Sequence, residues 1–257
     1  MLFYKTTVTV SINEAGKYLS VESTLSINYS DDPTKYDSEE QFANFREMKV
    51  GNLKPGLFFR GASPIDNSRN RAETVDSLLE KNGIKYVIDL ADKESSISGS
   101  KYQIHDYFKS LMDEDKVSFL GMAAAYKSDD FSSKMKTMFD AIMNNDGPFY
   151  IHCLEGKDRT GYVCMVIEAL CGATYEELID DYFITYYNYY GIEKGSEKYE
   201  VIKKLHIDEM IRYVFSFEES INLLGLNYHS EANSYLLNIG LSQEEIDSLQ
   251  NKISKSN

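Results

Sequence analysis

Residues 148–170 read PFYIHCLEGKDRTGYVCMVIEAL. The apolar residues at the start of this stretch predict a buried strand, and the apolar pattern that follows Gly161 predicts a helix. Between them, the string HCLEGKDRTG at 152–161 places Cys153 at the end of the strand and Arg159 at the mouth of the helix. The stretch therefore predicts a strand, a tight loop and a helix, which is a unit of an α/β fold.

The predicted loop contains the groups needed to bind a phosphate and attack it. Backbone N–H groups of a tight loop that enters a helix converge on a small concavity suited to an anion. The same partial positive charge stabilises a thiolate, so we expect Cys153 to be nucleophilic. Arg159 offers a planar fork of donors to two phosphoryl oxygens, and the glycines at 156 and 161 permit close backbone approaches. These features predict a phosphate-monoester hydrolase that works through a phosphocysteine intermediate.

The string resembles the cysteine-x5-arginine phosphate loop of the cysteine-dependent protein tyrosine phosphatase superfamily. Its GKDRTG form is most similar to the bacterial tyrosine/lipid phosphatase family, whose members combine phosphotyrosine and phosphoinositide activity. Further similar segments occur in the family's order, from residue 44 to the C-terminus: NFR at 44–46, PGLFFRGAS at 55–63, YEELIDDY at 175–182 and LLNIGLS at 236–242. The resemblance implies a tyrosine phosphatase-like fold with a central, mainly parallel sheet flanked by helices.

Roles for the loop residues follow from this chemistry. We expect Cys153 to attack phosphorus, Arg159 to stabilise charge on the equatorial oxygens, and Thr160 to donate its hydroxyl to the sulfur. His152 is expected to order the loop by hydrogen bonding rather than to act as a base. The expected phosphate-binding residues are Leu154, Glu155, Gly156, Lys157, Asp158, Arg159 and Thr160.

The proton donor to the leaving alcohol has several candidates. Many superfamily members use an aspartate on a movable loop well upstream of the cysteine, but the matching segment here, GMAAA at 121–125, has no carboxylate. The resemblance implies that Asp158, inside the phosphate loop, can serve as the acid. Asp129 and Asp130 are alternatives, although their position also fits an N-cap and the first turn of a helix. Asp92, which follows a predicted strand in the segment DLADKE at 89–94, is a further alternative; the family often has an arginine after its DL pair.

Other kinds of site fit the sequence less well. A Walker-type nucleotide loop is excluded because Lys157 is followed by Asp158 rather than Ser or Thr. No pair of Cys or His residues has zinc-ligand spacing, so we expect no metal and no other cofactor. Cys164 and Cys171 are expected to be core residues. The serious alternative is a catalytically inactive phosphate-binding module that has kept the loop but lost turnover.

Composition limits the partners and the compartment. The chain has 257 residues, 42% of them hydrophobic, which suffices for one sizeable core. It has no run of about 18 apolar residues, so we expect no membrane insertion, and a net charge of −14 disfavours nucleic acid as a partner. Three cysteines and no visible signal segment predict a cytoplasmic protein, or a secreted one if a signal was removed upstream. The oligomeric state is left open.

The chain divides into an N-terminal arm at 1–40 and a tyrosine phosphatase-like catalytic domain at 41–257. The arm is expected to contain a β-hairpin, with strands at 6–11 and 18–21 around a turn at 13–16. In the domain, strands are predicted at 57–59, 86–90, 117–120 and 149–152, and helices at 71–82 and 131–144. Residues 174–257 are expected to be helical. The tyrosines at 182–190 fit either helix packing or an aryl or lipid pocket.

The substrate follows least directly from the sequence. Lys157 adds a positive charge beside the phosphate cradle, whereas Glu155 adds a negative one, so the loop is only half adapted to a polyphosphorylated inositol. Phosphotyrosine needs a deep slot lined by aromatic groups, which suits the aromatic-rich surroundings. We therefore expect a protein-tyrosine phosphatase first and a phosphoinositide or inositol-phosphate phosphatase second.

Overall fold

The computed structural model describes residues 29–255, and the predicted hairpin at 6–21 lies outside the described residues. A five-stranded sheet forms the centre of the fold, in the order β1-β2-β5-β3-β4. Its strands are β1 (Arg46–Glu47), β2 (Phe58–Gly61), β3 (Tyr86–Asp89), β4 (Val117–Phe119) and β5 (Phe149–His152). All neighbouring pairs are parallel except β1 with β2. The predicted α/β fold with a mainly parallel central sheet is confirmed.

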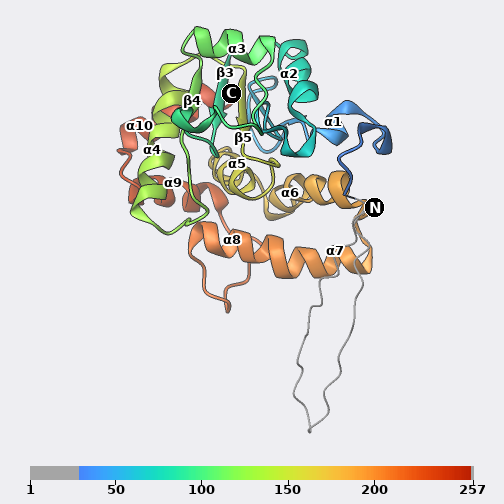
Figure 1. Cartoon of the computed structure of the whole chain (residues 1–257). Helices are drawn as coiled ribbons and strands as arrows, with labels where there is room; N and C mark the ends of the chain where they lie inside the picture. The colour runs from blue at the N-terminus through green and yellow to red at the C-terminus, as the bar shows by residue number, and fades with distance from the viewer. Residues whose placement is uncertain (1–28, 256–257) are drawn as a thin grey trace.

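Helices surround the sheet (Figure 1). The elements before β5 are α1 (Glu39–Phe42), α2 (Ala72–Lys81), α3 (Asp106–Asp113) and α4 (Asp129–Asn144), with short 3-10 turns at Pro33–Lys35, Asn67–Arg69 and Glu94–Ser96. Those after β5 are α5 (Asp158–Leu170), α6 (Tyr175–Tyr190), α7 (Glu197–Ile202), α8 (Asp208–Phe215), α9 (Tyr228–Asn238) and α10 (Gln243–Ile253). A π-helical segment, Lys203–Ile207, joins α7 to α8, and Figure 1 shows the three as one long rod. The helical C-terminal part is thereby confirmed.

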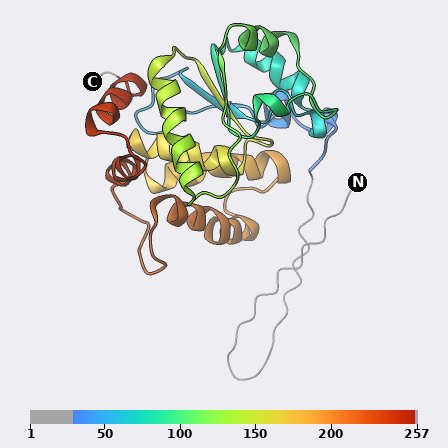
Figure 2. The ribbon, with the colours of Figure 1, turned by 60° about the vertical axis from the view of Figure 1, so that its left-hand side comes forward.

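The alternation of side chains along each strand builds two apolar layers. Phe58, Phe149 and Ile151 point into the larger core, which α4, α5, α8, α9 and α10 complete. Phe59 and Tyr150, their neighbours in the chain, point into the smaller core beneath α2 and α3. Figure 2 shows these helices on opposite sides of the sheet. Strands buried on both faces explain why the predicted strand segments are continuously apolar.

Helix α5 lies inside the larger core, and this position places the loop before it. Every residue of α5 from Thr160 to Leu170 is buried, as expected for a helix that is apolar on all sides. The helix follows β5, the middle strand, so the β5–α5 loop lies at the carboxyl edge of the sheet. This edge is where open parallel sheets bind their ligands.

Local sequence explains most element ends, and the structure adds elements that were not expected, including α1. Ser128 caps α4 by accepting from the amide of Phe131 at 3.1 Å, so the cap is Ser128 and not an aspartate. Thr174 and Glu177 form a capping box at the start of α6. Neither the two-residue edge strand β1 nor α3 was expected from the sequence, because a short edge strand carries almost no periodic signal. Within residues 29–255, no helix is long and apolar enough to cross a bilayer.

Candidate active site

Cys153 lies directly after the middle strand of the sheet. Strand β5 pairs on one side with β2 and on the other with β3, so His152 is in register with Gly61 and with Asp89. The Cys153 side chain is buried, with 4% of the residue exposed. The loop that follows ends at Asp158, the first residue of α5. The predicted strand, loop and helix therefore have the expected arrangement around the cysteine.

The first carbonyl groups of the loop are hydrogen-bonded to donors outside its concave side. His152 donates from Nδ1 to the carbonyl oxygen of Cys153 at 3.1 Å. Because a carbonyl only accepts, this bond requires the proton of the neutral imidazole to be on Nδ1. The backbone amide of Ser63, just beyond β2, donates to the carbonyl oxygen of Leu154 at 3.0 Å.

The next two carbonyl groups are held by side chains from distant parts of the chain. The hydroxyl of Tyr189 in α6 donates to the carbonyl oxygen of Glu155 at 2.7 Å. Asn44 donates from Nδ2 to the same oxygen at 3.2 Å. Arg60, in β2, donates to the carbonyl oxygen of Gly156 at 3.2 Å. These bonds fix the loop with its carbonyls turned towards the protein.

The amide groups and side chains of the loop are left free to bind an anion. Within residues 29–255, the backbone amides from Leu154 to Arg159 donate to no protein acceptor. The Thr160 hydroxyl is buried and has no hydrogen-bond partner among these residues. Arg159 uses one guanidinium nitrogen to donate to the carbonyl oxygen of Met122 at 2.9 Å, which ties it to the loop between β4 and α4. The arrangement is that of an anion cradle beside a cysteine.

Gly156 makes the shape of this cradle possible. Its φ of +66° lies in the left-handed region that side chains disfavour. A Cβ at this position would overlap the carbonyl group of Gly61 and lie 2.8 Å from its Cα. The end of β2 and the phosphate loop therefore approach each other more closely than any residue but glycine allows.

A buried group of charges lies behind the cradle. Asp181, in α6, accepts from Arg46 at 2.9 Å and from Arg60 at 2.5 Å. Burial alone would raise the pKa of Asp181, but the two guanidinium groups outweigh it and hold that pKa well below its usual range. Burial and the nearby Asp181 charge raise the pKa of Glu168, in α5, well above its usual value. Arg60 thus connects a charged, structural cluster to the loop carbonyl of Gly156.

A second buried carboxyl group lies behind the nucleophile. The Oδ2 atom of Asp89 is 3.9 Å from Nε2 of His152, and both side chains are completely buried. Burial raises the pKa of Asp89, although His152 acts in the opposite direction. The second oxygen of Asp89 accepts from the amides of Ala91 and Asp92 at 2.8 and 3.0 Å and shapes the turn after β3. His152 is therefore hydrogen-bonded through Nδ1 alone, while its Nε2 and the facing Oδ2 of Asp89 have no hydrogen-bond partner among residues 29–255.

Lys157 and Asp158 form the part of the loop nearest to α6. The ammonium group of Lys157 lies 5.6 and 5.7 Å from the ring centroids of Tyr186 and Tyr190 and 3.9 Å from Oδ1 of Asp158. Burial alone would lower the pKa of Lys157, but the charge of Asp158 and the tyrosines outweigh it and raise the pKa, so the group stays cationic. The side chain of Asp158 is 57% exposed and begins the first turn of α5.

The other candidate acids have structural partners or stand on a helix start. Asp129 and Asp130 occupy the first turn of α4, and Asp130 forms an ion pair with Lys134 at 2.8 Å. Asp92 is buried and accepts a 2.6 Å hydrogen bond from the hydroxyl of Tyr102. Among the four aspartates, Asp158 alone belongs to the phosphate loop.

Several tyrosines of α6 pack against neighbouring elements, which is the first of the two interpretations offered by the sequence. Tyr182, Tyr186 and Tyr189 are buried, and Tyr189 reaches the loop backbone. The ring of Tyr182 lies where a Cβ on Gly161 would have to go, so this glycine allows α5 and α6 to approach closely. The alternative of an aryl or lipid pocket stays a prediction.

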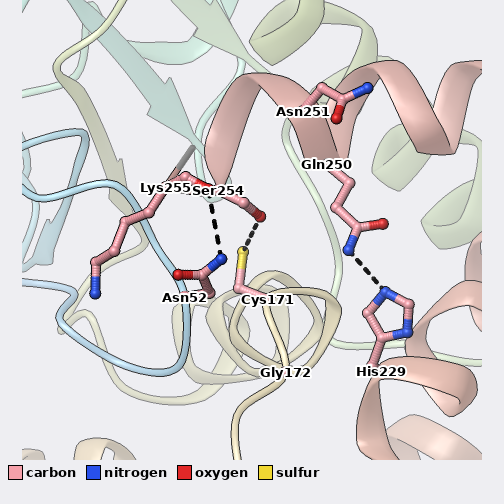
Figure 3. A pocket seen from close by; sticks show the side chains of 8 residues that line it. All are labelled: Asn52, Cys171, Gly172, His229, Gln250, Asn251, Ser254 and Lys255. Carbon is pink, nitrogen blue, oxygen red and sulfur yellow. Dashed lines mark hydrogen bonds between the residues drawn. The ribbon is translucent and has the colours of Figure 1, made fainter. Parts of the chain in front are cut away.

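The two remaining cysteines lie in the core, as expected. Burial raises the pKa of Cys164 to about 12 and that of Cys171 to about 11, so both are thiols at neutral pH. Cys171 borders a cavity of about 590 Å³ at the far end of α5, next to the end of α10 (Figure 3). Helix α5 has 13 residues and is therefore about 20 Å long, which separates this cavity from Cys153.

Sequence reasoning missed the residues that hold the loop from behind. Asn44, Arg46 and Arg60 lie in segments that were singled out only as family-like, and Asp181 and Tyr189 lie in α6. The signal available was a pattern of polar residues inside apolar segments, such as the arginine of FFRG at 58–61. A buried arginine needs a partner, but its identity is decided by the fold.

A model of the tyrosine phosphatase family matches residues 39–255. A search among curated proteins finds no match. Two similar solved structures are the core catalytic domain of the PP-IP phosphatase SIW14 from S. cerevisiae in complex with citrate, and the Siw14 catalytic core. The first has 19% identity and a TM-score of 0.39, with 68% of this chain and 92% of that chain covered. The second has 18% identity and a TM-score of 0.37, with 68% and 90% covered.

Proposed function

The chain belongs to the tyrosine phosphatase family, and on that premise we propose that it hydrolyses phosphate monoesters through a phosphocysteine intermediate, with protein phosphotyrosine as its substrate. The observation that carries the proposal is the loop itself, whose carbonyls accept hydrogen bonds from the surrounding protein, while the amides from Leu154 to Arg159, next to Cys153, have no acceptor among residues 29–255. Residues 41–257 form the proposed catalytic domain. The proposal makes residues 1–40 an accessory arm.

In the first step, the thiolate of Cys153 attacks phosphorus, an S–P bond forms, and the P–O bond to the leaving alcohol breaks. The amides from Leu154 to Arg159 and the free donors of the Arg159 guanidinium bind the equatorial oxygens. These donors are already oriented before substrate binds, so they stabilise the developing charge without reorganisation. The buried Thr160 hydroxyl supplies a donor that stabilises the sulfur as a thiolate.

We assign the proton donor to Asp158. Its carboxyl group protonates the leaving oxygen in the first step. In the second step, the resulting carboxylate takes a proton from the attacking water, the S–P bond breaks, and phosphate and the thiolate are released. Asp158 is favoured because it lies within the proposed phosphate loop with its side chain 57% exposed, whereas Asp92 is buried against Tyr102 and Asp129 and Asp130 lie in the first turn of α4.

Aromatic side chains on both sides of the loop support an aryl phosphate as substrate. Tyr126, in the loop between β4 and α4, stacks on Tyr162 with ring centroids 4.9 Å apart. Burial, with the nearby charges of Asp158 and Cys153, raises the pKa of Tyr126, so its phenol stays neutral close to the site. Tyr186 and Tyr190 lie on the other side, around Lys157. Rings at these positions can pack against the phenyl group of phosphotyrosine.

A phosphoinositide or inositol phosphate is the second candidate substrate. The cationic side chain of Lys157, inside the loop, favours it, because a second phosphate group next to the cradle would find a positive charge there. The GKDRTG string, with its resemblance to bacterial tyrosine/lipid phosphatases, supports the same alternative.

Hydrolysis of p-nitrophenyl phosphate by the wild type and by Cys153→Ser, with reductant present, tests the proposal. We expect turnover in the wild type and none in the variant, which should still bind vanadate because the cradle is intact. Steady-state turnover by a folded Cys153→Ser variant would contradict the phosphocysteine mechanism. Vanadate binding without turnover by the wild type would instead identify an inactive phosphate-binding module.

A phosphotyrosine peptide and a phosphoinositide, compared by kcat/KM, test the substrate assignment. We expect the higher value for the peptide. A higher value for the phosphoinositide would replace the first candidate by the second.

A further inference from the structure

Resting on the proposed function, we propose that Glu155 is a specificity-determining residue that restricts the site to substrates with one phosphate group. It does so by neutralising Arg69, the cation that would otherwise bind a second phosphate beside the loop. Tyr29 is the positioning residue that holds Glu155 in place. The argument rests on the contacts of these three side chains at the rim of the cradle.

Glu155 is oriented by contacts to both its backbone and its carboxylate. Its carbonyl oxygen is held by Tyr189 and Asn44, as described above. The phenol of Tyr29 donates to Oε1 of the same residue at 2.9 Å. The Glu155 side chain is 22% exposed, so it lies at the edge of the loop with a defined direction.

Arg69 is the second partner of the Glu155 carboxylate. Its Nε atom lies 3.7 Å from Oε1 of Glu155, and one terminal nitrogen lies 3.7 Å from Oδ2 of Asp31. The Arg69 side chain is 39% exposed, so a ligand arriving from solvent can reach it. At present its charge is shared between two carboxylates, and a phosphate would have to compete with both.

Tyr29 is itself fixed by packing, which allows it to hold Glu155. Its ring contacts that of Tyr189 edge-to-face, with centroids 5.2 Å apart. The guanidinium groups of Arg69 and Arg71 each lie 5.0 Å from the centroid of the Tyr29 ring. Burial raises the pKa of Tyr29, so its hydroxyl keeps the proton that it donates to Glu155.

Two cations beside the loop each have a carboxylate partner. Lys157 has Asp158 at 3.9 Å, and Arg69 has Glu155 at 3.7 Å. On the Glu155 side of the anion site that we assign to Arg159 and the loop amides, the charge of Arg69 is thus balanced by the carboxylates of Glu155 and Asp31. A substrate with a single phosphate group binds such a site at full strength, whereas a second phosphate group on the same substrate adds little binding energy.

Two inhibitors of p-nitrophenyl phosphate hydrolysis test this inference. The Ki of inorganic phosphate measures binding to the cradle alone, whereas the Ki of inositol hexakisphosphate also depends on the charges at the rim. We expect Glu155→Gln to raise the ratio of Ki for phosphate to Ki for inositol hexakisphosphate by about tenfold at low salt, because Arg69 then keeps only Asp31 as a carboxylate partner among residues 29–255 and can bind a second phosphate group more strongly. Salt at about 0.5 M should remove most of this gain by screening.

Further variants distinguish the effect of the charge on Arg69 from general changes in the loop. In Glu155→Gln with Arg69→Gln, the gain should disappear, because the cation is gone. Tyr29→Phe should give a smaller gain in the same direction. Tyr36→Phe is the matched control, because its hydroxyl bonds to Ser30 and Arg71 in the same segment without touching Glu155, and it should leave the ratio unchanged.

Different results would contradict the inference about Glu155 and the proposed phosphatase function. Wild-type turnover that depends on Cys153, together with an unchanged inhibitor ratio in Glu155→Gln, would overturn the inference and leave the function standing. A gain that persists in the double variant would also overturn it. If the wild type has no turnover, the function fails, and calorimetric dissociation constants for the same two ligands and variants still decide the rim inference.

Discussion

Replacing Gly156 by alanine should damage both the stability and the activity of the protein. Two costs apply at this position. The residue has φ +66°, which costs an L-residue about 1–2 kcal/mol. The new Cβ would also overlap the carbonyl group of Gly61, and because both partners are backbone, no rotamer change can relieve the overlap. Overpacking of this kind costs about 1–3 kcal/mol.

The expected loss in the free energy of unfolding is therefore about 2–5 kcal/mol, or about 5–15 °C in Tm for a chain of this size. Gly56→Ala is the matched control, because Gly56 has φ +70° but nothing within 4 Å of a Cβ. It should lose only the conformational cost of about 1–2 kcal/mol. Urea denaturation of both variants measures the difference, which isolates the close approach of the loop to β2.

The activity of Gly156→Ala follows from the same overlap. The loop must move away from β2, and a displacement of about 1 Å in a reacting group costs about 100-fold in rate. We therefore expect kcat/KM for p-nitrophenyl phosphate to fall by about 100-fold in the fraction that remains folded. If Gly156→Ala is as stable as Gly56→Ala and keeps its activity within a few-fold, the loop does not need this contact, and the reasoning is refuted.

Four other results are expected. Asp158→Asn should slow hydrolysis of aryl phosphates with poor leaving groups far more than of those with good ones, because only the former need a proton donor; equal losses in kcat across a leaving-group series would move the acid elsewhere. Asp181→Asn should lower the free energy of unfolding at neutral pH by about 3–5 kcal/mol, because it leaves two buried guanidinium groups without their partner. Because the folded pKa of Asp181 lies below its unfolded value of 3.8, wild-type stability should fall as the pH drops below that value, and the variant should lose this acid dependence in urea titrations. The effect of Glu168 on the pH dependence of stability is opposite to that of Asp181. Because its pKa is raised in the folded protein, Glu168 contributes stability in acid that is lost as the pH rises above the unfolded value of 4.5. Glu168→Gln should therefore be more stable than the wild type at neutral pH and equal to it in acid. Finally, Cys164 and Cys171 should resist iodoacetamide at neutral pH in the folded protein, because burial raises their pKa values to about 12 and about 11; mass spectrometry showing rapid labelling would contradict their core positions.

Local patterns determined most of the fold in advance. The apolar segments that predicted strands at 57–59, 86–90, 117–120 and 149–152 correspond to β2, β3, β4 and β5. The predicted helices at 71–82 and 131–144 correspond to α2 and α4. The spacing of apolar residues and the residues that start or end a helix are properties of short stretches of sequence, so they can be recognised without knowing the fold. The strand β1 was missed because two residues are too few to show a period, whereas α3 has a clear apolar face around Phe108 and Leu111 that was overlooked.

The candidate active site also has one part that the sequence predicted and another that only the fold brings together. Cys153, Arg159 and the glycines between and beside them are neighbours in the chain, so the sequence alone predicted a nucleophile and an anion-binding loop at the end of a strand. The residues that hold this loop come from far away: Asn44 lies 111 positions from Glu155, and Arg60 lies 96 positions from Gly156. The contact of Tyr29 with Glu155 spans 126 positions.

Only the tertiary structure could pair these groups. A buried arginine or a loop carbonyl needs a partner wherever it occurs, but many polar residues in the chain could supply one. Sheet order and helix packing decide which of them come within hydrogen-bonding distance. The sequence thus determined which chemistry the loop carries, while the fold decided how the loop is held and which charges surround it.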